Sequence, residues 1–175
     1  MTRFLHKNRH ATKKEGGYIL LLTLLVISIL LAVGFGIYDI TQREVRLSSF
    51  LRDSGKALAA ADRGAECALY WDRSTGPLLN GLPYTIFATS TNYTSPNLSN
   101  VNCDGINFSA GWTVTKTFAT GTTVFNLPFA DGTCVDVTVI KGGSETTTVI
   151  GDGYNTCNAA LPRRTQREIA VSTNF

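Results

Sequence analysis

An uncharged apolar run near the N-terminus constrains this chain more than any other feature. The run extends from Tyr18 to Tyr38 and is dominated by Leu, Ile and Val. At about 1.5 Å per residue, its 21 residues would make a helix of about 30 Å, the thickness of the hydrocarbon core of a bilayer. We therefore predict a transmembrane helix over this run.

The charges on the two sides of the run predict its orientation. Five basic residues and one glutamate precede it, whereas Asp39 is the first charged residue after it. By the positive-inside rule, we expect the N-terminus in the cytoplasm and the rest of the chain outside. The whole chain has a formal net charge of +3, and the head alone has +4, so the remainder is slightly negative. This balance does not favour a nucleic-acid surface.

A cleaved secretory signal is the first alternative for this region. Such signals have an apolar part of about 7–15 residues, followed by a cleavage site of small residues. The run is longer than that. Cleavage near the segment LLAVGFG, which ends at Gly36, stays open as the alternative.

The helix is expected to continue beyond the apolar run. Apolar and small residues recur there at three- and four-residue steps or their sums, while charged residues lie off this stripe. Neither proline nor a strong turn signal appears before the segment DRSTGP, so one helix of about 80 Å is predicted from Tyr18 to Trp71. We expect its end, from Leu58 to Trp71, to cover the core of the exported domain. The members of the stripe are Ile40, Leu47, Leu51, Leu58, Ala61, Ala65 and Ala68.

Four glycines are weak points of this predicted helix, because each costs about 1 kcal/mol relative to alanine. Gly34 and Gly36 lie in the apolar run. They would let the helix loosen or bend, or else let another helix pack closely in the membrane. Gly55 and Gly64 would likewise allow a neighbour to approach closely.

After Trp71 the composition changes to Thr, Ser, Asn, Gly and β-branched residues. Runs with period-two alternation between turn residues predict strands. The candidate strands are Tyr84–Ala88, Trp112–Phe118, Thr122–Phe129, Cys134–Ile140, Thr146–Ile150 and Arg167–Ser172. Hairpin turns are predicted at ATGT, ADGT and KGGSE, and an irregular surface loop from Ser90 to Gly105. The predicted fold class is α+β, a long helix whose lower half packs on an antiparallel sheet.

All four cysteines fall in the part that is expected to be exported. Disulfides persist outside the cytoplasm, and an even number of cysteines favours pairing. Cys134 and Cys157 flank the hairpin predicted at KGGSE, so strand pairing could bring them together and leave Cys67 for Cys103. The other pairings and four buried free thiols stay open. No metal site is expected, because no pair has CxxC-type spacing and both histidines precede the run.

No catalytic constellation is apparent in the exported part. His6 and His10 both precede the apolar run, which removes Ser-His-Asp and Cys-His arrangements. Glycine loops of the phosphate-binding type are absent. Four carboxylates lie on predicted strands and turns, and we expect them to be solvated: Asp131, Asp136, Asp152 and Glu168. The sequence therefore predicts neither an enzyme nor a cofactor.

Several features together resemble the type IV pilin and pseudopilin superfamily. They are a short basic leader, a glycine, an aromatic first residue, an uninterrupted apolar helix, and then an amphipathic helix and a sheet. The segment LAAADRGAECALYWD from Leu58 resembles the helix end of PilX-type minor pilins, and RRTQREIAV resembles the closing strand of their relatives. The specific resemblance covers residues 13–71, and the sheet only by type.

The resemblance implies processing at the cytoplasmic face of the membrane. A prepilin peptidase would cut after Gly17 and methylate the new amine of Tyr18. Gly16 is a competing site, but cutting there would put glycine first, which fits the family less well. Four segments would result: a leader over 1–17, the membrane and fibre-core helix over 18–38, an amphipathic stem over 39–71 and a β-rich exported domain over 72–175.

The resemblance also implies a structural fibre subunit. It would lie in the cytoplasmic membrane before assembly and in an extracellular pilus afterwards, and adhesion is a function of such fibres. Its partners would be other pilin subunits through the N-terminal helix, with an assembly platform and ATPase acting indirectly. Major pilins usually have a glutamate at the fifth mature position, where this chain has Leu22. That departure resembles minor subunits that prime assembly or lie at the tip.

Other functions stay open at this point. A major pilin of a divergent lineage is one, and a type II secretion pseudopilin is another, although the tip-type pseudopilin without the glutamate is usually larger. A single-pass anchor that displays a β-rich adhesion module and never assembles is a third. That protein would keep its leader. An exported enzyme on a stalk finds no support among the residues.

Overall fold

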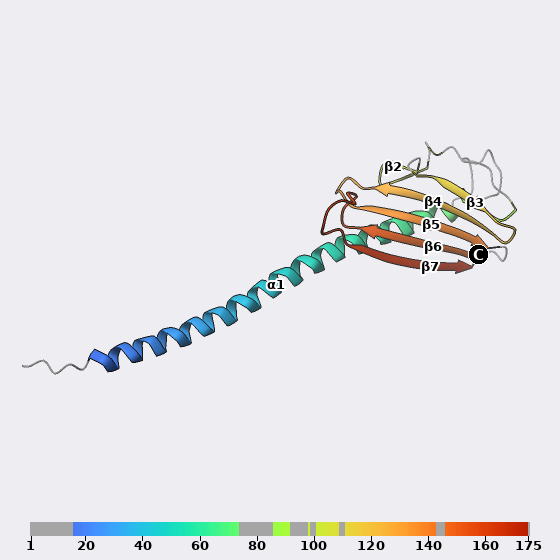
Figure 1. The fold of residues 1–175 in the computed structure, drawn as a ribbon. Helices are drawn as coiled ribbons and strands as arrows, with labels where there is room; N and C mark the ends of the chain where they lie inside the picture. Colours follow the sequence, from blue (N-terminus) through green and yellow to red (C-terminus); the bar gives the residue numbers. More distant parts are fainter. Residues whose placement is uncertain are drawn as a thin grey trace, which may run out of the picture. The chain divides into compact units, whose positions relative to one another are not determined.

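The computed structural model describes residues 16–73, 86–91, 98, 101–108, 111–142 and 146–174. The described chain forms one α-helix, α1 (Gly16–Arg73), followed by short and long antiparallel strands (Figure 1). It divides into two compact units, the first ending at Leu47 and the second covering Ser48–Phe175. The architecture is α+β, as predicted.

The sheet of the second unit has five strands in chain order. They are β3 (Thr113–Lys116), β4 (Thr120–Pro128), β5 (Cys134–Gly142), β6 (Thr146–Tyr154) and β7 (Gln166–Asn174), and each pairs antiparallel with the next. Two further strands, β1 (Asn102–Cys103) and β2 (Ile106–Asn107), form a small hairpin of their own. Figure 1 shows the end of α1 lying across one face of the larger sheet.

The sheet is covered on one face, as the alternating burial of residues along its central strands shows. Along β4, β5 and β6, buried residues alternate with half-buried ones. The buried side chains are mainly β-branched or aromatic and form one core with the helix. That core includes Phe87, Phe108, Phe125, Leu127, Val135, Val137, Val139 and Val149. On the helix, alanines supply the matching face: Ala57, Ala60, Ala61, Ala65 and Ala68 are all buried.

Glycines on both elements set the close distance between α1 and the sheet. A methyl group added at Gly64 of the helix would lie 2.6 Å from Val135 Cγ1. One added at Gly151 of β6 would lie 2.8 Å from the Ala61 carbonyl oxygen, and one at Gly153 would collide with the backbone of Ala57 and Ala61. The helix backbone therefore rests almost directly on the backbone of β6.

The predicted helix is confirmed, and its buried face agrees with the predicted stripe at the alanines but not at Leu58. α1 begins two residues before Tyr18 and ends two residues after Trp71. Ala61, Ala65 and Ala68 are buried as expected, whereas Leu58 is 49% exposed. At about 100° per residue, the leucines lie to one side of the alanine face. The sheet selects the smaller residues because its glycines bring it too close for leucine.

Two segments after the helix differ from the prediction. Residues 86–88 are not in a strand, although all three are buried; the Ala88 N–H donates to Thr123 Oγ1 at 3.2 Å rather than to a neighbouring strand. Tyr84 and Thr85 lie outside the described residues. The end of the predicted loop, from Asn102, is the β1–β2 hairpin, which turns at Asp104 and Gly105 with positive φ at both.

The remaining strands and turns agree with the alternation pattern. β3 to β7 correspond to the predicted strands, and β6 runs four residues further than expected. The ADGT turn is confirmed, with Gly132 at φ +82°. The ATGT turn begins earlier than expected, because β4 already starts at Thr120. Residues 143–145 of the KGGSE turn lie outside the described residues, but the register of β5 on β6 is that of a hairpin.

Candidate functional site

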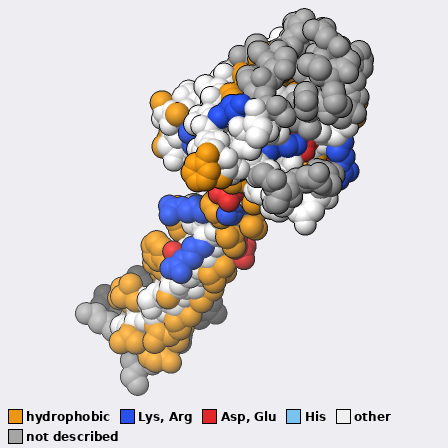
Figure 2. Space-filling model, turned by 90° about the vertical axis from the view of Figure 1, so that its right-hand side faces the viewer, with side chains coloured by type: hydrophobic (Ala, Val, Ile, Leu, Met, Phe, Trp, Pro, Cys, Tyr) orange, Lys and Arg blue, Asp and Glu red, His pale blue; other side chains and the backbone are white. Residues whose placement is uncertain are grey.

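The exposed apolar surface of α1 is the first candidate site. Every large hydrophobic side chain described between Tyr18 and Tyr38 is exposed in the structure. Figure 2 shows hydrophobic side chains over the visible face of this helix. By length and composition alone, α1 is apolar enough to cross a membrane. Within the described chain, nothing covers this surface.

The predicted processing residues lie at the beginning of that helix. Gly17 and Tyr18 are in the first turn of α1, and both are exposed. Leu22 is exposed one turn later, on the uncovered apolar surface. Gly34 and Gly36 have open space where a Cβ would stand, so nothing in the described chain requires glycine at either position.

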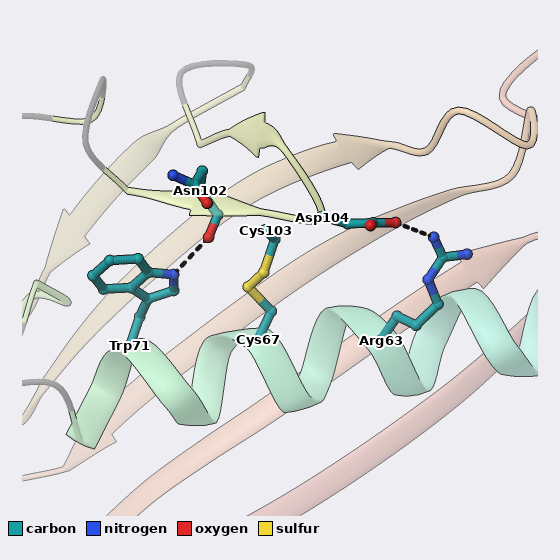
Figure 3. The surroundings of a disulfide bond; sticks show 6 residues. All are labelled: Arg63, Cys67, Trp71, Asn102, Cys103 and Asp104. Carbon is teal, nitrogen blue, oxygen red and sulfur yellow. Dashed lines mark hydrogen bonds and ion pairs between the residues drawn. A yellow bond between two sulfur atoms is a disulfide. The ribbon is translucent and has the colours of Figure 1, made fainter.

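A second site joins the end of α1 to the β1–β2 hairpin. Arg63, Cys67 and Trp71 follow at four-residue steps, so they lie on one face of the helix. All three bind the hairpin (Figure 3). Cys67 forms a disulfide with Cys103 over a Cα–Cα distance of 6.2 Å. The Trp71 indole N–H donates to the Asn102 carbonyl at 2.9 Å.

Arg63 completes this site through two carboxylates and a ring. Its guanidinium donates to Asp104 Oδ2 at 2.6 Å and to Asp131 Oδ2 at 3.0 Å. It also lies over the Phe129 ring, 3.9 Å from the centroid. Burial opposes the charged form of Arg63, but the hydrogen bonds to both carboxylates outweigh it and raise its pKa. One fully charged side chain thus ties α1 to the hairpin and to the β4–β5 turn.

Asp131 is held in its charged form mainly by its own turn. The Thr133 hydroxyl and backbone N–H donate to Oδ1 at 2.6 and 3.0 Å. Together with Arg63, these hydrogen bonds lower the pKa of Asp131. A shallow surface groove of about 500 Å³ runs beside this site, lined by Arg63, Glu66, Cys67, Tyr70, Asn102, Cys103, Asp104 and Phe129.

The other predicted disulfide is not formed in the structure. Cys134 is a buried free thiol and Cys157 an exposed one. Burial, with the neighbouring Cys157 thiol, raises the pKa of Cys134 to about 12. The β5–β6 hairpin between the two residues is formed, and a bond between Cys134 and Cys157 stays a prediction.

Three of the named carboxylates lie at opposite positions on neighbouring strands. Asp136 is directly opposite Asp152, which is directly opposite Glu168. Amide side chains bind two of them: Asn126 donates to Asp136 Oδ1 at 2.6 Å, and Gln166 donates to Asp152 Oδ1 at 2.8 Å. Among the described residues, no group of three or more His, Cys, Asp or Glu side chains is arranged to hold a metal ion.

Sequence reasoning missed a buried ion pair. Lys141, near the end of β5, donates to Asp72 at the end of α1, and both side chains are almost completely inaccessible. The residues are 69 positions apart, so no local pattern joins them. The one available signal was that Lys141 continues the inward-facing alternation of β5, which would have predicted a buried charge and hence a partner.

Comparison of the chain with protein-family models, with curated proteins and with solved structures finds no match. The functional interpretation therefore depends on the residues and on the geometry described above.

Proposed function

We propose that this chain is a structural subunit of a type IV pilus or a related fibre, most like a minor pilin that primes assembly or occupies the tip. Before assembly it lies in the cytoplasmic membrane with its C-terminus outside. In the fibre, its N-terminal helix packs among those of other pilin subunits and the sheet domain is displayed.

The uncovered apolar surface from Tyr18 to Tyr38 is the observation that carries this proposal. Burying one large aliphatic side chain is worth about 1.5–3 kcal/mol, so the surface needs an apolar partner. Lipid tails and neighbouring helices both satisfy that need. Lipid tails are as apolar as leucine, so the helix gains no hydrophobic free energy when it leaves the bilayer and packs against neighbouring helices. An assembly ATPase and platform must therefore supply the work.

The beginning of α1 supports the processing step. Gly16 and Gly17 precede the first apolar residue, and a glycine offers a protease an unhindered backbone. Cleavage after Gly17 leaves the whole apolar helix on the mature protein. Methylation of the Tyr18 amine by the same prepilin peptidase then modifies the end of the helix that is buried in the fibre.

Leu22 supports a minor rather than a major subunit. It is one exposed apolar residue among others on α1, in the position where major pilins usually have a glutamate. A carboxylate in the bilayer is costly, so leucine stabilises the subunit in the membrane. It also removes a partner for the amine of a neighbouring subunit, a contact that a priming or tip subunit does not need on that side.

The first experiment compares the full-length chain expressed with and without a prepilin peptidase. We expect a product that begins at Tyr18, heavier by one methyl group, and formed only with the peptidase. Intact mass and the N-terminal peptide measure both changes. Gly17→Val should block cleavage by crowding the scissile bond, whereas Gly16→Val is the matched control and should still be cut.

The other outcomes separate the alternatives. An uncut chain in both strains would contradict the proposal and indicate a permanently anchored display protein. A product that begins after residue 36 would indicate an ordinary secreted domain. Where cleavage occurs, isolating fibres of a pilus or of a secretion pseudopilus and probing them for this chain distinguishes a pilin from a pseudopilin.

A further inference from the structure

The two cysteines outside the Cys67–Cys103 bond are brought together by backbone contacts. Cys134 is the first residue of β5, and Cys157 follows the end of β6 by three residues. The Cys157 N–H donates to the Gly132 carbonyl at 3.2 Å, and its thiol donates to the Thr133 carbonyl at 3.2 Å. Both acceptors directly precede Cys134, so Cys157 is fixed on the turn that leads into β5.

The two thiols differ strongly in accessibility. Cys134 is 3% exposed and belongs to the end of the sheet, whereas Cys157 is exposed. Burial raises the pKa of Cys134 to about 12, and the neighbouring Cys157 thiol adds to the effect. Since the thiolate is the reactive form, Cys134 is a poor nucleophile toward any reagent in solution.

We propose that the bond expected between Cys134 and Cys157 forms by thiol–disulfide exchange in a fixed order, in which Cys157 reacts first and Cys134 closes the bond. The two contacts of Cys157 with residues 132 and 133 hold its sulfur beside Cys134 before reaction. The bond would fasten the exposed segment between β6 and β7 to the β4–β5 turn.

The oxidant is a low-molecular-weight or protein disulfide, RSSR. Cys157 loses its proton, and its sulfur attacks one sulfur of RSSR and expels RS⁻, which takes up a proton to become RSH. Cys134 then loses its proton and attacks the Cys157 sulfur of the mixed disulfide, and the second RS⁻ leaves and is protonated. The two protein thiols lose two electrons in total, and RSSR is reduced to two RSH.

Formation of this bond in the cell rests on the proposed function, because that function exports the domain to an oxidising compartment. The order in which the two thiols react does not rest on the proposed function. It follows from the geometry and is testable on the purified chain, so failure here and failure of the pilin proposal are separate results.

The test uses the full-length protein in detergent micelles, fully reduced and then exposed to oxidised glutathione, with samples quenched in acid over time. Trypsin cleaves after Lys116, Lys141 and Arg163, so Cys134 and Cys157 fall on different peptides, and neither peptide contains Cys67 or Cys103. We expect glutathione to appear first on the Cys157 peptide. A cross-linked pair of peptides, with the loss of two hydrogens, should then replace it.

Two variants make the order of reaction falsifiable. Cys134→Ser should trap glutathione on Cys157, because the resolving thiol is absent. Cys157→Ser should leave Cys134 reacting with glutathione at least about tenfold more slowly than Cys157 does in the native chain. Re-formation of the Cys67–Cys103 link reports that each variant has folded. Equal rates at Cys134 and Cys157, or a native-state link from either to Cys67 or Cys103, would overturn the proposal.

Discussion

Lys141 and Asp72 form an ion pair that is buried between β5 and the end of α1. The Asp72 side chain has no exposed surface, and among the described residues its Oδ2 atom accepts no hydrogen bond. Taking both charges out of water is costly, so the pair itself adds little net stability. Removing one partner is different, because it leaves the other charge buried and uncompensated.

The variant Lys141→Met should therefore lower the free energy of unfolding by about 3–5 kcal/mol. Lys116→Met is the matched control, since Lys116 is an exposed strand lysine, and it should change stability by less than about 0.5 kcal/mol. Urea unfolding in micelles, followed by the fluorescence of Trp71 and Trp112, measures both. A loss below about 1 kcal/mol for Lys141→Met would contradict burial of an uncompensated charge. Adding Asp72→Leu to Lys141→Met should restore much of the loss.

Asp131 predicts a dependence of stability on pH. Because its pKa is lowered in the folded protein, its interactions stabilise the fold above the ordinary carboxyl pKa. This stability disappears as the pH falls through the lowered folded value. Asp131→Asn should thus be less stable than the native chain at neutral pH, by under about 1 kcal/mol because the side chain is half exposed. The difference should vanish once the pH is below that lowered value.

Thr133→Val tests the cause of that shift. The Thr133 hydroxyl is the largest contributor to the lowered pKa of Asp131, so its removal should weaken the same pH dependence. Unfolding midpoints measured between about pH 2 and 7 give the comparison. An Asp131→Asn difference that persists unchanged in acid would show that the loss is one of packing and not of charge.

At the scale of the elements, close packing of α1 on β6 decides the architecture of the second unit. The alanine face of the helix and the glycines of β6 let the two backbones approach. Gly153→Ala places a methyl group against the backbone of Ala57 and Ala61, which cannot move aside as a flexible side chain can. We expect a loss of about 1–3 kcal/mol.

Gly55→Ala is the matched control for that substitution. Gly55 lies on α1, the helix that Gly153 contacts, with open space where the new Cβ would stand, and the substitution should stabilise the protein by about 1 kcal/mol through helix propensity. Thermal or urea unfolding should show a lower free energy of unfolding for Gly153→Ala and a higher one for Gly55→Ala. A stabilising Gly153→Ala would show that the helix and sheet are not in the close contact described.

At the scale of the whole molecule, the Cys67–Cys103 bond joins α1 to the chain that follows it. The bond closes a loop of 36 residues, for which loss of chain entropy in the unfolded state is worth about 4 kcal/mol. The double variant Cys67→Ala/Cys103→Ala should be less stable by an amount of that order, measured by denaturant unfolding. Because it keeps Cys134 and Cys157, it separates this bond from any second one. A change below about 1 kcal/mol would contradict a stabilising role.

Much of the fold could be predicted from local pattern, and most of the tertiary contacts could not. The long helix followed from an uninterrupted run without proline, and β3 to β7 followed from period-two alternation and glycine turns. The strand expected at Tyr84–Ala88 was wrong over its described residues, because Ala88 bonds to a threonine side chain, a choice that alternation cannot reveal. The predicted stripe was correct at Ala61, Ala65 and Ala68 and wrong at Leu58, because spacing identifies a face only approximately and the partner decides which residues of it are buried.

The sequence by itself determined the apolar helix, the fold class and the positions of most strands, since these depend on residue type and on spacing along a few turns or strands. Only the tertiary structure decided that alanines rather than leucines meet the sheet, that Lys141 pairs with Asp72, and that Arg63, Cys67 and Trp71 hold one hairpin. The ion pair and the hairpin contacts join residues 31 to 69 positions apart. Their partners are set by how closely the elements pack, a distance that no local pattern of the chain encodes.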